Sequence, residues 1–129
     1  MLGKAYYNCH AFTPSRRRFI VEIKAKFWVE NRGEVVLGSG KAALLLSVNE
    51  NGSIQRAAEE FGMSYRHAWG IIRKMEQRAG FKLVNAQAGG GEGKGAQLTA
   101  RGKDLLEKFS LFEETLRKIT TEKFREIFK

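Results

Sequence analysis

The strongest constraint on the fold is a pair of short helical patterns joined by a turn at Gly62. Ser53 and Ser64 stand where helix N-caps are expected, and Gly62 can adopt the positive φ that a tight turn requires. The sequence therefore predicts helices over Ile54–Phe61 and Tyr65–Ala79, which together form a helix-turn-helix. The apolar positions expected in their shared core are Ile54, Ala57, Ala58, Phe61, Ala68, Ile71, Ile72 and Met75.

Before this motif the sequence predicts a β-hairpin and one more helix. Over Phe19–Val29 apolar and polar residues alternate, a period that favours a strand with one buried face. Asn31–Gly33 is a predicted turn, so Glu34–Leu37 is expected to pair with the first strand. Lys41–Val48 is then predicted to be a helix that stops at Asn49–Gly52.

After the motif the pattern is strand, glycine loop, strand and long helix. Phe81–Asn85 and Ala96–Leu98 are predicted strands around the loop Ala88–Gly95, and Thr99 can cap a helix that runs to about Phe128. We therefore expect an α+β, mainly α fold: a winged helix-turn-helix with an N-terminal β-hairpin and a long C-terminal helix. The predicted domains are an N-terminal extension (1–18), the winged helix-turn-helix (19–98) and the long helix (99–129).

The charge of the chain favours a polyanionic partner such as nucleic acid. The 129 residues include 23 Lys+Arg and 14 Asp+Glu, a net charge of +9. Arg16–Arg18 could contact phosphates or form a solvated charged run. No apolar run reaches about 18 residues, so no membrane span is expected. One cysteine cannot form an internal disulfide, and we expect a cytoplasmic protein without cofactor or metal.

The second helix of the motif carries the surface predicted to contact double-stranded DNA. In a helix-turn-helix, the N-terminal end of this helix lies in the major groove, where Arg66 could pair with two acceptors of guanine. Trp69 is expected in the core or half-buried rather than at the bases. The candidate DNA contacts are Ser64, Tyr65, Arg66, His67, Gly70, Arg73 and Lys74, with Gln55 and Arg56 of the supporting helix and Lys94 of the glycine loop.

The last helix carries a heptad pattern that predicts a helix–helix interface. Its apolar residues are spaced four and three apart, and Phe124 continues the apolar face after a shift of register. A second copy of the chain would bury this face and place two recognition helices roughly 34 Å apart; the alternative is a helix that folds back on its own domain. The candidate dimer residues are Leu105, Phe109, Phe112, Leu116, Ile119 and Phe124.

Nucleotide binding and catalysis lack the residues that they require. A Walker motif needs a Ser or Thr after its Gly-Lys pair, whereas Gly93-Lys94 is followed by glycine. The two histidines are His10 and His67, and the adjacency of Cys9 and His10 is too little for a zinc or catalytic site. We therefore expect that the chain is not an enzyme.

These residues resemble the N-terminal DNA-binding domain of ModE-type molybdate-responsive transcriptional regulators, over about residues 19–128. The helix-turn-helix is also similar to that of LysR-type regulators. A Ser-Tyr-x-x-Ala-Trp signature is joined to a glycine-rich wing and Leu-Thr-x-x-Gly. The matching residues are Gly52–Ile54, Ala57-Ala58, Met63–Trp69, Met75-Glu76, Gly89–Gly95, Gln97–Thr99 and Gly102.

The resemblance implies a winged-helix homodimer, held by its first strand region and long last helix, that binds an operator through the helix after Ser64 and the wing. Full-length members of the family carry oxyanion-binding domains after the long helix, and this sequence shows none. We therefore expect a sequence-specific DNA-binding transcriptional regulator without the molybdate-binding domain, with a separate oxyanion-sensing protein as a further candidate partner. The alternative is a winged-helix protein-interaction module whose long helix docks a separate sensor or partner protein.

Overall fold

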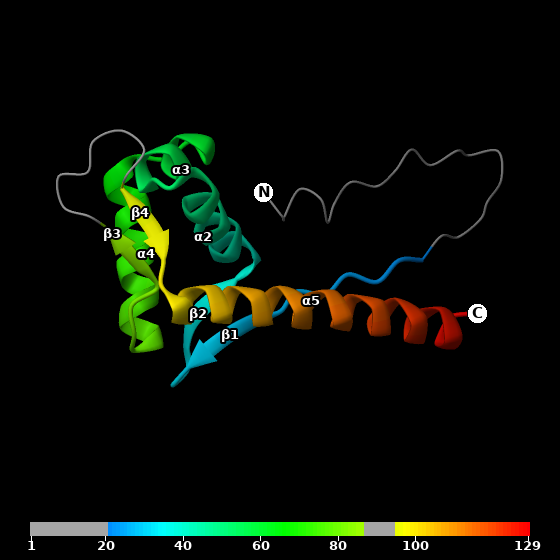
Figure 1. Cartoon of the computed structure of the whole chain (residues 1–129). Coiled ribbons are helices and arrows are strands. Elements are labelled where there is room, and N and C mark those ends of the chain that lie inside the picture. Colours follow the sequence, from blue (N-terminus) through cyan, green and yellow to red (C-terminus); the bar gives the residue numbers. More distant parts are fainter. Residues whose placement is uncertain (1–20, 87–94) are drawn as a thin grey trace, which may run out of the picture.

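A computed structural model of the chain describes residues 21–86 and 95–129. Two antiparallel two-stranded sheets, β1–β2 and β3–β4, flank the helices. Helices α2, α3 and α4 gather at one end of the molecule, and α5 projects away from them (Figure 1). The elements are β1 (Trp28–Asn31), β2 (Glu34–Gly38), α2 (Ser39–Asn51), α3 (Ile54–Glu60), α4 (Tyr65–Ala79), β3 (Val84–Ala86), β4 (Ala96–Leu98) and α5 (Ala100–Ile127).

The predicted helix-turn-helix is confirmed, because local signals set both of its helices. The Ser53 hydroxyl accepts the backbone N–H of Arg56 at 3.2 Å, and the Ser64 hydroxyl accepts that of His67 at 3.1 Å. Gly62 has a φ of 66°, the left-handed value expected for the turn. The α+β, mainly α winged fold is therefore the observed one.

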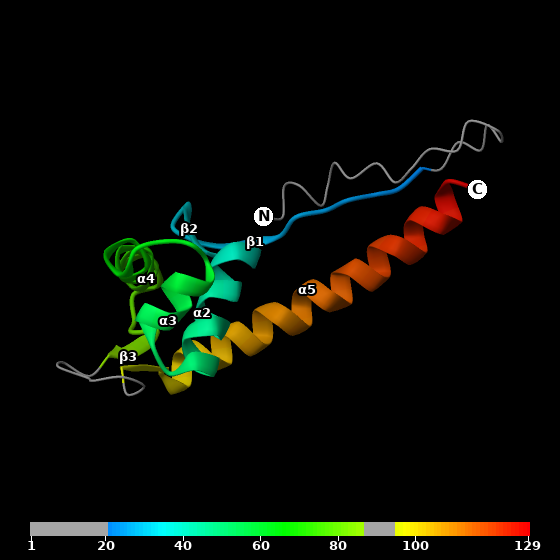
Figure 2. The same cartoon turned by 90° about the horizontal axis from the view of Figure 1, so that it is seen from above.

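The predicted strand over Phe19–Val29 is wrong in its bounds. Residues 21–27 are not in a strand, and β1 begins only at Trp28, which pairs with Gly38. The physical reason is that β2 ends at Gly38, where α2 begins, so β2 has no residues left to pair with the earlier segment. Residues 21–27 instead run away from the three-helix end in the same direction as α5 (Figure 2).

Two further predicted boundaries are wrong. The helix predicted over Lys41–Val48 is longer and spans Ser39–Asn51, where the Asn51 side chain donates to the Ser47 carbonyl at 2.9 Å. Gly52, the last residue of the predicted stop Asn49–Gly52, ends the helix in a left-handed conformation. The strand expected from Phe81 begins only at Val84. The backbone N–H groups of Leu83 and Val84 donate to the Glu76 side chain of α4. Strand pairing therefore starts later than the sequence pattern suggests.

The core lies where α2, α3 and α4 meet β2, the start of α5 and the strands β3 and β4, which are the described strands of the predicted wing. Its largest fully buried side chains are Leu37, Leu45, Val48, Met75 and Leu83. Burial of each such side chain stabilises the fold by about 1.5–3 kcal/mol.

The start of α5 joins this core through a close backbone contact. A Cβ added to Gly102 would lie 2.4 Å from the carbonyl oxygen of Leu83. Only glycine allows this approach, and it places Leu106 and Phe109 in the core.

Candidate nucleic-acid interface

Helix α4 turns one face to the core and the opposite face outward. Ala68, Ile72 and Met75 are buried, as the sequence predicts. All seven candidate DNA contacts on and before this helix are exposed. Gln55 and Arg56 are also exposed, at the start of α3, and Lys94 lies outside the described residues. The structure therefore brings the predicted residues of α4 together on one accessible surface.

The start of α4 borders an open hollow of about 510 Å³, which we call the α4 hollow. It is lined by Ser64, Arg66, His67, Gly70, Ile71 and Lys74. Nothing lies within 4 Å of the position that a Cβ on Gly70 would occupy. The hollow therefore presents cationic and hydrogen-bonding side chains around open space, a chemistry suited to phosphates and base edges.

Trp69 lies on the outer surface of α4 and is more exposed than the core or half-buried position expected from the sequence. Its side chain is 39% exposed, and the Arg73 guanidinium lies 4.8 Å from the centre of its ring. Tyr65, one turn earlier, is 45% exposed. Tyr65, Trp69 and Arg73 thus follow one helix face at four-residue spacing, a signal that the sequence contained.

The wing is attached to α4 by a carboxylate that sequence reasoning did not single out as functional. The N–H groups of Leu83 and Val84 donate to Glu76 Oε2 at 2.8 and 3.2 Å. From the other side, the Thr99 hydroxyl donates to the Lys82 carbonyl at 2.7 Å. These bonds set the direction in which the chain enters and leaves the wing.

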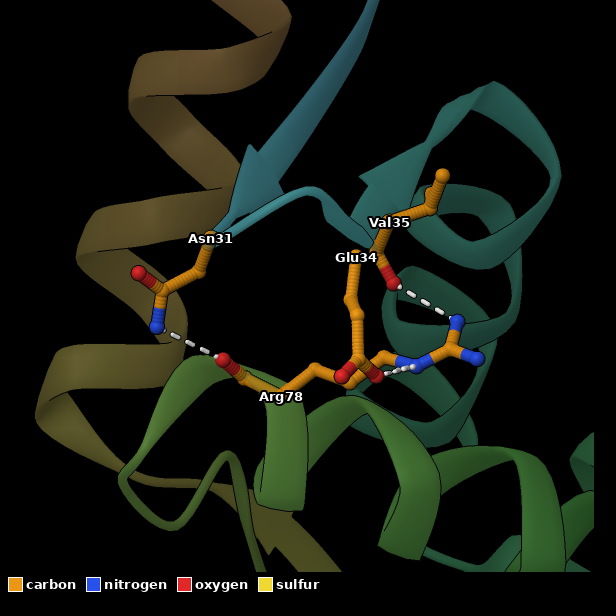
Figure 3. Close-up of polar contacts among 4 residues, drawn as sticks. All are labelled: Asn31, Glu34, Val35 and Arg78. Carbon is orange, nitrogen blue, oxygen red and sulfur yellow. Dashed lines mark hydrogen bonds and ion pairs between the residues drawn. The ribbon is translucent and has the colours of Figure 1, made fainter.

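The β1–β2 turn is attached to the end of α4 by Arg78, which sequence reasoning also missed (Figure 3). Arg78 Nε donates to Glu34 Oε2 at 3.1 Å, and Nη1 donates to the Val35 carbonyl at 3.0 Å. The Asn31 side-chain amide donates to the Arg78 carbonyl at 2.8 Å. No short-range pattern reports this contact, because 43 residues or more separate Arg78 from its partners.

The predicted dimer residues of α5 lie in two different surroundings. Phe109 is only 6% exposed and belongs to the domain's own core, against which Leu105 also packs. Phe112 and Ile119 are 62% and 48% exposed, whereas Leu116 and Phe124 are half-buried. Only the part of α5 after Phe109, which we call the outer part of α5, is therefore available to a second chain.

Within residues 21–86 and 95–129, no three His, Cys, Asp or Glu side chains come together in a way that could hold a metal ion. In that same part of the chain, no helix combines the length and the apolar character needed to cross a membrane.

The three helices, the wing and the exposed face of α4 define a winged helix-turn-helix domain. Residues 41–103 match the family described as bacterial regulatory helix-turn-helix protein, lysR family. This stretch, just under half of the chain, is therefore similar to helix-turn-helix domains of the LysR type.

Proteins similar to this chain come from several bacteria. The chain is 35% identical to the molybdenum-pterin-binding protein MopB of Rhodobacter capsulatus over 83 residues, which are 64% of this chain and 31% of MopB. It is also 35% identical to the DNA-binding transcriptional dual regulator ModE of Escherichia coli K12 over 78 residues, 60% of this chain and 30% of ModE. The match thus spans about a third of each relative. Neither of these relatives is named as an enzyme.

Two solved structures share the fold. CbnR_DBD in a complex with DNA has a TM-score of 0.53 at 21% identity and covers 70% of this chain and 97% of that chain. BenM_DBD in a complex with benA site 1 DNA has a TM-score of 0.50 at 15% identity, covering 68% and 93%.

Proposed function

We propose that the chain is the sequence-specific, duplex-DNA-binding part of a transcriptional regulator. The observation that supports this most directly is the α4 hollow, where Arg66, His67 and Lys74 surround the open space at Gly70. No Asp or Glu is among the residues that line this hollow. The LysR-type domain and the regulators among the relatives support the same function.

In this proposal the N-terminal end of α4 enters the major groove. The Arg66 guanidinium pairs with O6 and N7 of a guanine, because its planar fork matches two acceptors in one plane. Gly70 leaves room for the DNA to approach the helix closely. Arg73, held over Trp69, and Lys74 contact phosphates that set the register of the helix.

The test is selection of bound duplexes from a random pool, followed by titration of the preferred duplex with fluorescence anisotropy. Arg66→Ala is expected to lose about 1–3 kcal/mol of discrimination at one base pair. The matched control is Arg117→Ala, which removes an exposed α5 arginine paired with Glu113 at 3.6 Å. Unchanged binding by an Arg66→Ala/Lys94→Ala double variant would contradict this placement.

We also propose a homodimer formed through the outer part of α5. Large apolar side chains are exposed there, including Leu111 and Phe112, which are 67% and 62% exposed. Val21 and Ile23 of the segment running in the same direction are 40% and 44% exposed. A second copy would cover both surfaces and present two α4 helices to successive turns of the duplex.

Sedimentation equilibrium of the chain tests this assembly. We expect a dimer, and we expect a Phe112→Asp/Ile119→Asp double variant to be a folded monomer. Lys108→Ala, which removes an exposed α5 cation paired with Asp104, is the control. A monomeric wild type that forms a stable complex with a different protein would favour the protein-interaction alternative.

The names of the relatives raise the question of a molybdenum effector, acting directly or through a separate oxyanion-sensing protein. We propose that molybdate alone does not alter DNA binding by residues 1–129, because the match to MopB and ModE covers only about a third of each relative. Repeating the titration with molybdate tests this directly. A change in affinity would show that the chain itself responds to the oxyanion.

A further inference from the structure

A second hollow, which we call the turn hollow, continues the basic surface at the C-terminal end of α4. Its volume is about 650 Å³, and residues of the β1–β2 turn and of the last turns of α4 line it, among them Arg32, Lys74 and Arg78. Lys74 lines the α4 hollow as well. The two hollows therefore meet at one lysine and form a continuous surface along α4.

The turn hollow holds more positive charge than its acids balance. Glu34 is the only carboxylate among its lining residues, and Arg78 Nε already donates to it at 3.1 Å. Lys41 lies close by: burial lowers its pKa from the ordinary value of 10.5, and the charges of Arg78 and Lys74 lower it further. An anion in the hollow would relieve this repulsion.

The side chain of Arg32 is carried by a rigid turn. Arg32 and Gly33 both have positive φ, 53° and 80°, as in a two-residue type I′ hairpin, where Asn or Gly is the favoured first residue. The contacts of Arg78 with Glu34 and Val35, and of Asn31 with Arg78, hold both sides of this turn against α4 (Figure 3). An arginine therefore occupies a costly backbone position at a fixed place on the basic surface.

We propose that the turn hollow binds a DNA backbone phosphate through Arg32 and Lys74. This inference rests on the proposed DNA-binding function and extends its contact surface to the β1–β2 turn. Lys74 lies eight residues after Arg66, roughly 12 Å along the helix, which is close to the width of the major groove. When Arg66 reaches base edges, Lys74 and Arg32 stand where the phosphate backbone borders the groove.

The test is the salt dependence of binding to the selected duplex, measured by fluorescence anisotropy on the full chain. Arg32→Gly removes the guanidinium and accepts the positive φ, so the turn is retained. It is expected to reduce the slope of log K against log salt by about 1 and to weaken binding about tenfold at 0.1 M salt, with base preference unchanged. Arg32→Lys should keep the slope, and Arg117→Ala is the matched control for a distant arginine.

The measurements distinguish loss of the phosphate site from loss of DNA binding as a whole. If the wild type binds no duplex, the proposed function fails. If the wild type binds and Arg32→Gly keeps the wild-type slope, only the phosphate site is overturned. A titration with inorganic phosphate, followed by NMR, tests whether the site binds a free anion instead of DNA. Phosphate binding at Arg32 and Lys74, together with an unchanged salt slope for DNA binding by Arg32→Gly, would overturn the assignment to DNA.

Discussion

Both β-hairpins are attached to the last turns of α4, but by side chains of opposite charge and in different surroundings. Glu76 accepts two backbone N–H groups of the wing in a partly buried place. Arg78, two residues later, donates to a backbone carbonyl and to Glu34, whose side chain is 64% exposed. The wing attachment should therefore contribute more to stability, since buried amides without partners cost more than a solvent-screened ion pair.

The most damaging way to break the wing attachment is to move Leu83, whose N–H is bonded to Glu76 and whose carbonyl faces Gly102. Gly102→Ala should lower the free energy of unfolding by about 3 kcal/mol, because the new Cβ meets backbone that cannot move aside. Urea denaturation followed by circular dichroism measures this loss. Gly40→Ala, at a helical glycine with nothing within 4 Å, is the control and should be neutral or slightly stabilising.

A milder test removes the carboxylate itself. Glu76→Ala should cost about 2 kcal/mol of unfolding free energy, because the N–H groups of Leu83 and Val84 lose their acceptor. Hydrogen exchange at these two amides should accelerate more than at amides of α2. Glu107→Ala, at an exposed acid of α5, is the control, and an equal effect of both variants would show that Glu76 does not hold the wing.

The turn attachment should be weaker. Arg78→Ala is expected to cost about 1 kcal/mol, since one bond goes to an exposed carboxylate and the other to a partly buried carbonyl. Denaturation at low and high salt separates the contributions of the two bonds, because salt screens only the ion pair of Arg78 with Glu34. If Glu34→Gln matches Arg78→Ala in stability, the bond to the Val35 carbonyl contributes nothing.

The smallest effect concerns Lys41, beside the turn attachment. The pKa of Lys41 is lowered in the folded state by burial and by the charges of Arg78 and Lys74. The folded chain therefore binds the proton of the Lys41 ammonium group less tightly than the unfolded chain does. The resulting destabilisation is present at neutral pH and is relieved as pH rises toward 10.5. Lys41→Gln should raise the denaturation midpoint slightly at pH 7, with the difference shrinking by pH 10. A difference constant with pH would exclude this charge effect.

Features with a local signal were predictable from the sequence. Ser53, Ser64 and Thr99 cap their helices as expected, and Gly62 turns the chain between α3 and α4. The bounds of the first strand were not predictable, because alternation between residues 19 and 29 carries no information on the length of the partner strand β2. The sequence also led us to expect Trp69 in the core or half-buried, whereas Trp69 is 39% exposed and lies under Arg73.

The candidate site shows the same division. The residues of α4 that face outward were predictable, since helix periodicity places them on one side. The two attachments by Glu76 and Arg78 were not, and neither was the turn hollow that sets Arg32 beside Lys74. These arrangements join elements distant along the chain.

By itself, the sequence determined the helix-turn-helix, its caps and its basic outward face, because each depends on residues within a few positions of one another. Only the tertiary structure decided which part of α5 enters the core, how the two hairpins lie on α4 and where the two hollows meet. These features depend on close approach between distant segments, as at Gly102 and Leu83, and such an approach is set by packing rather than by any local pattern.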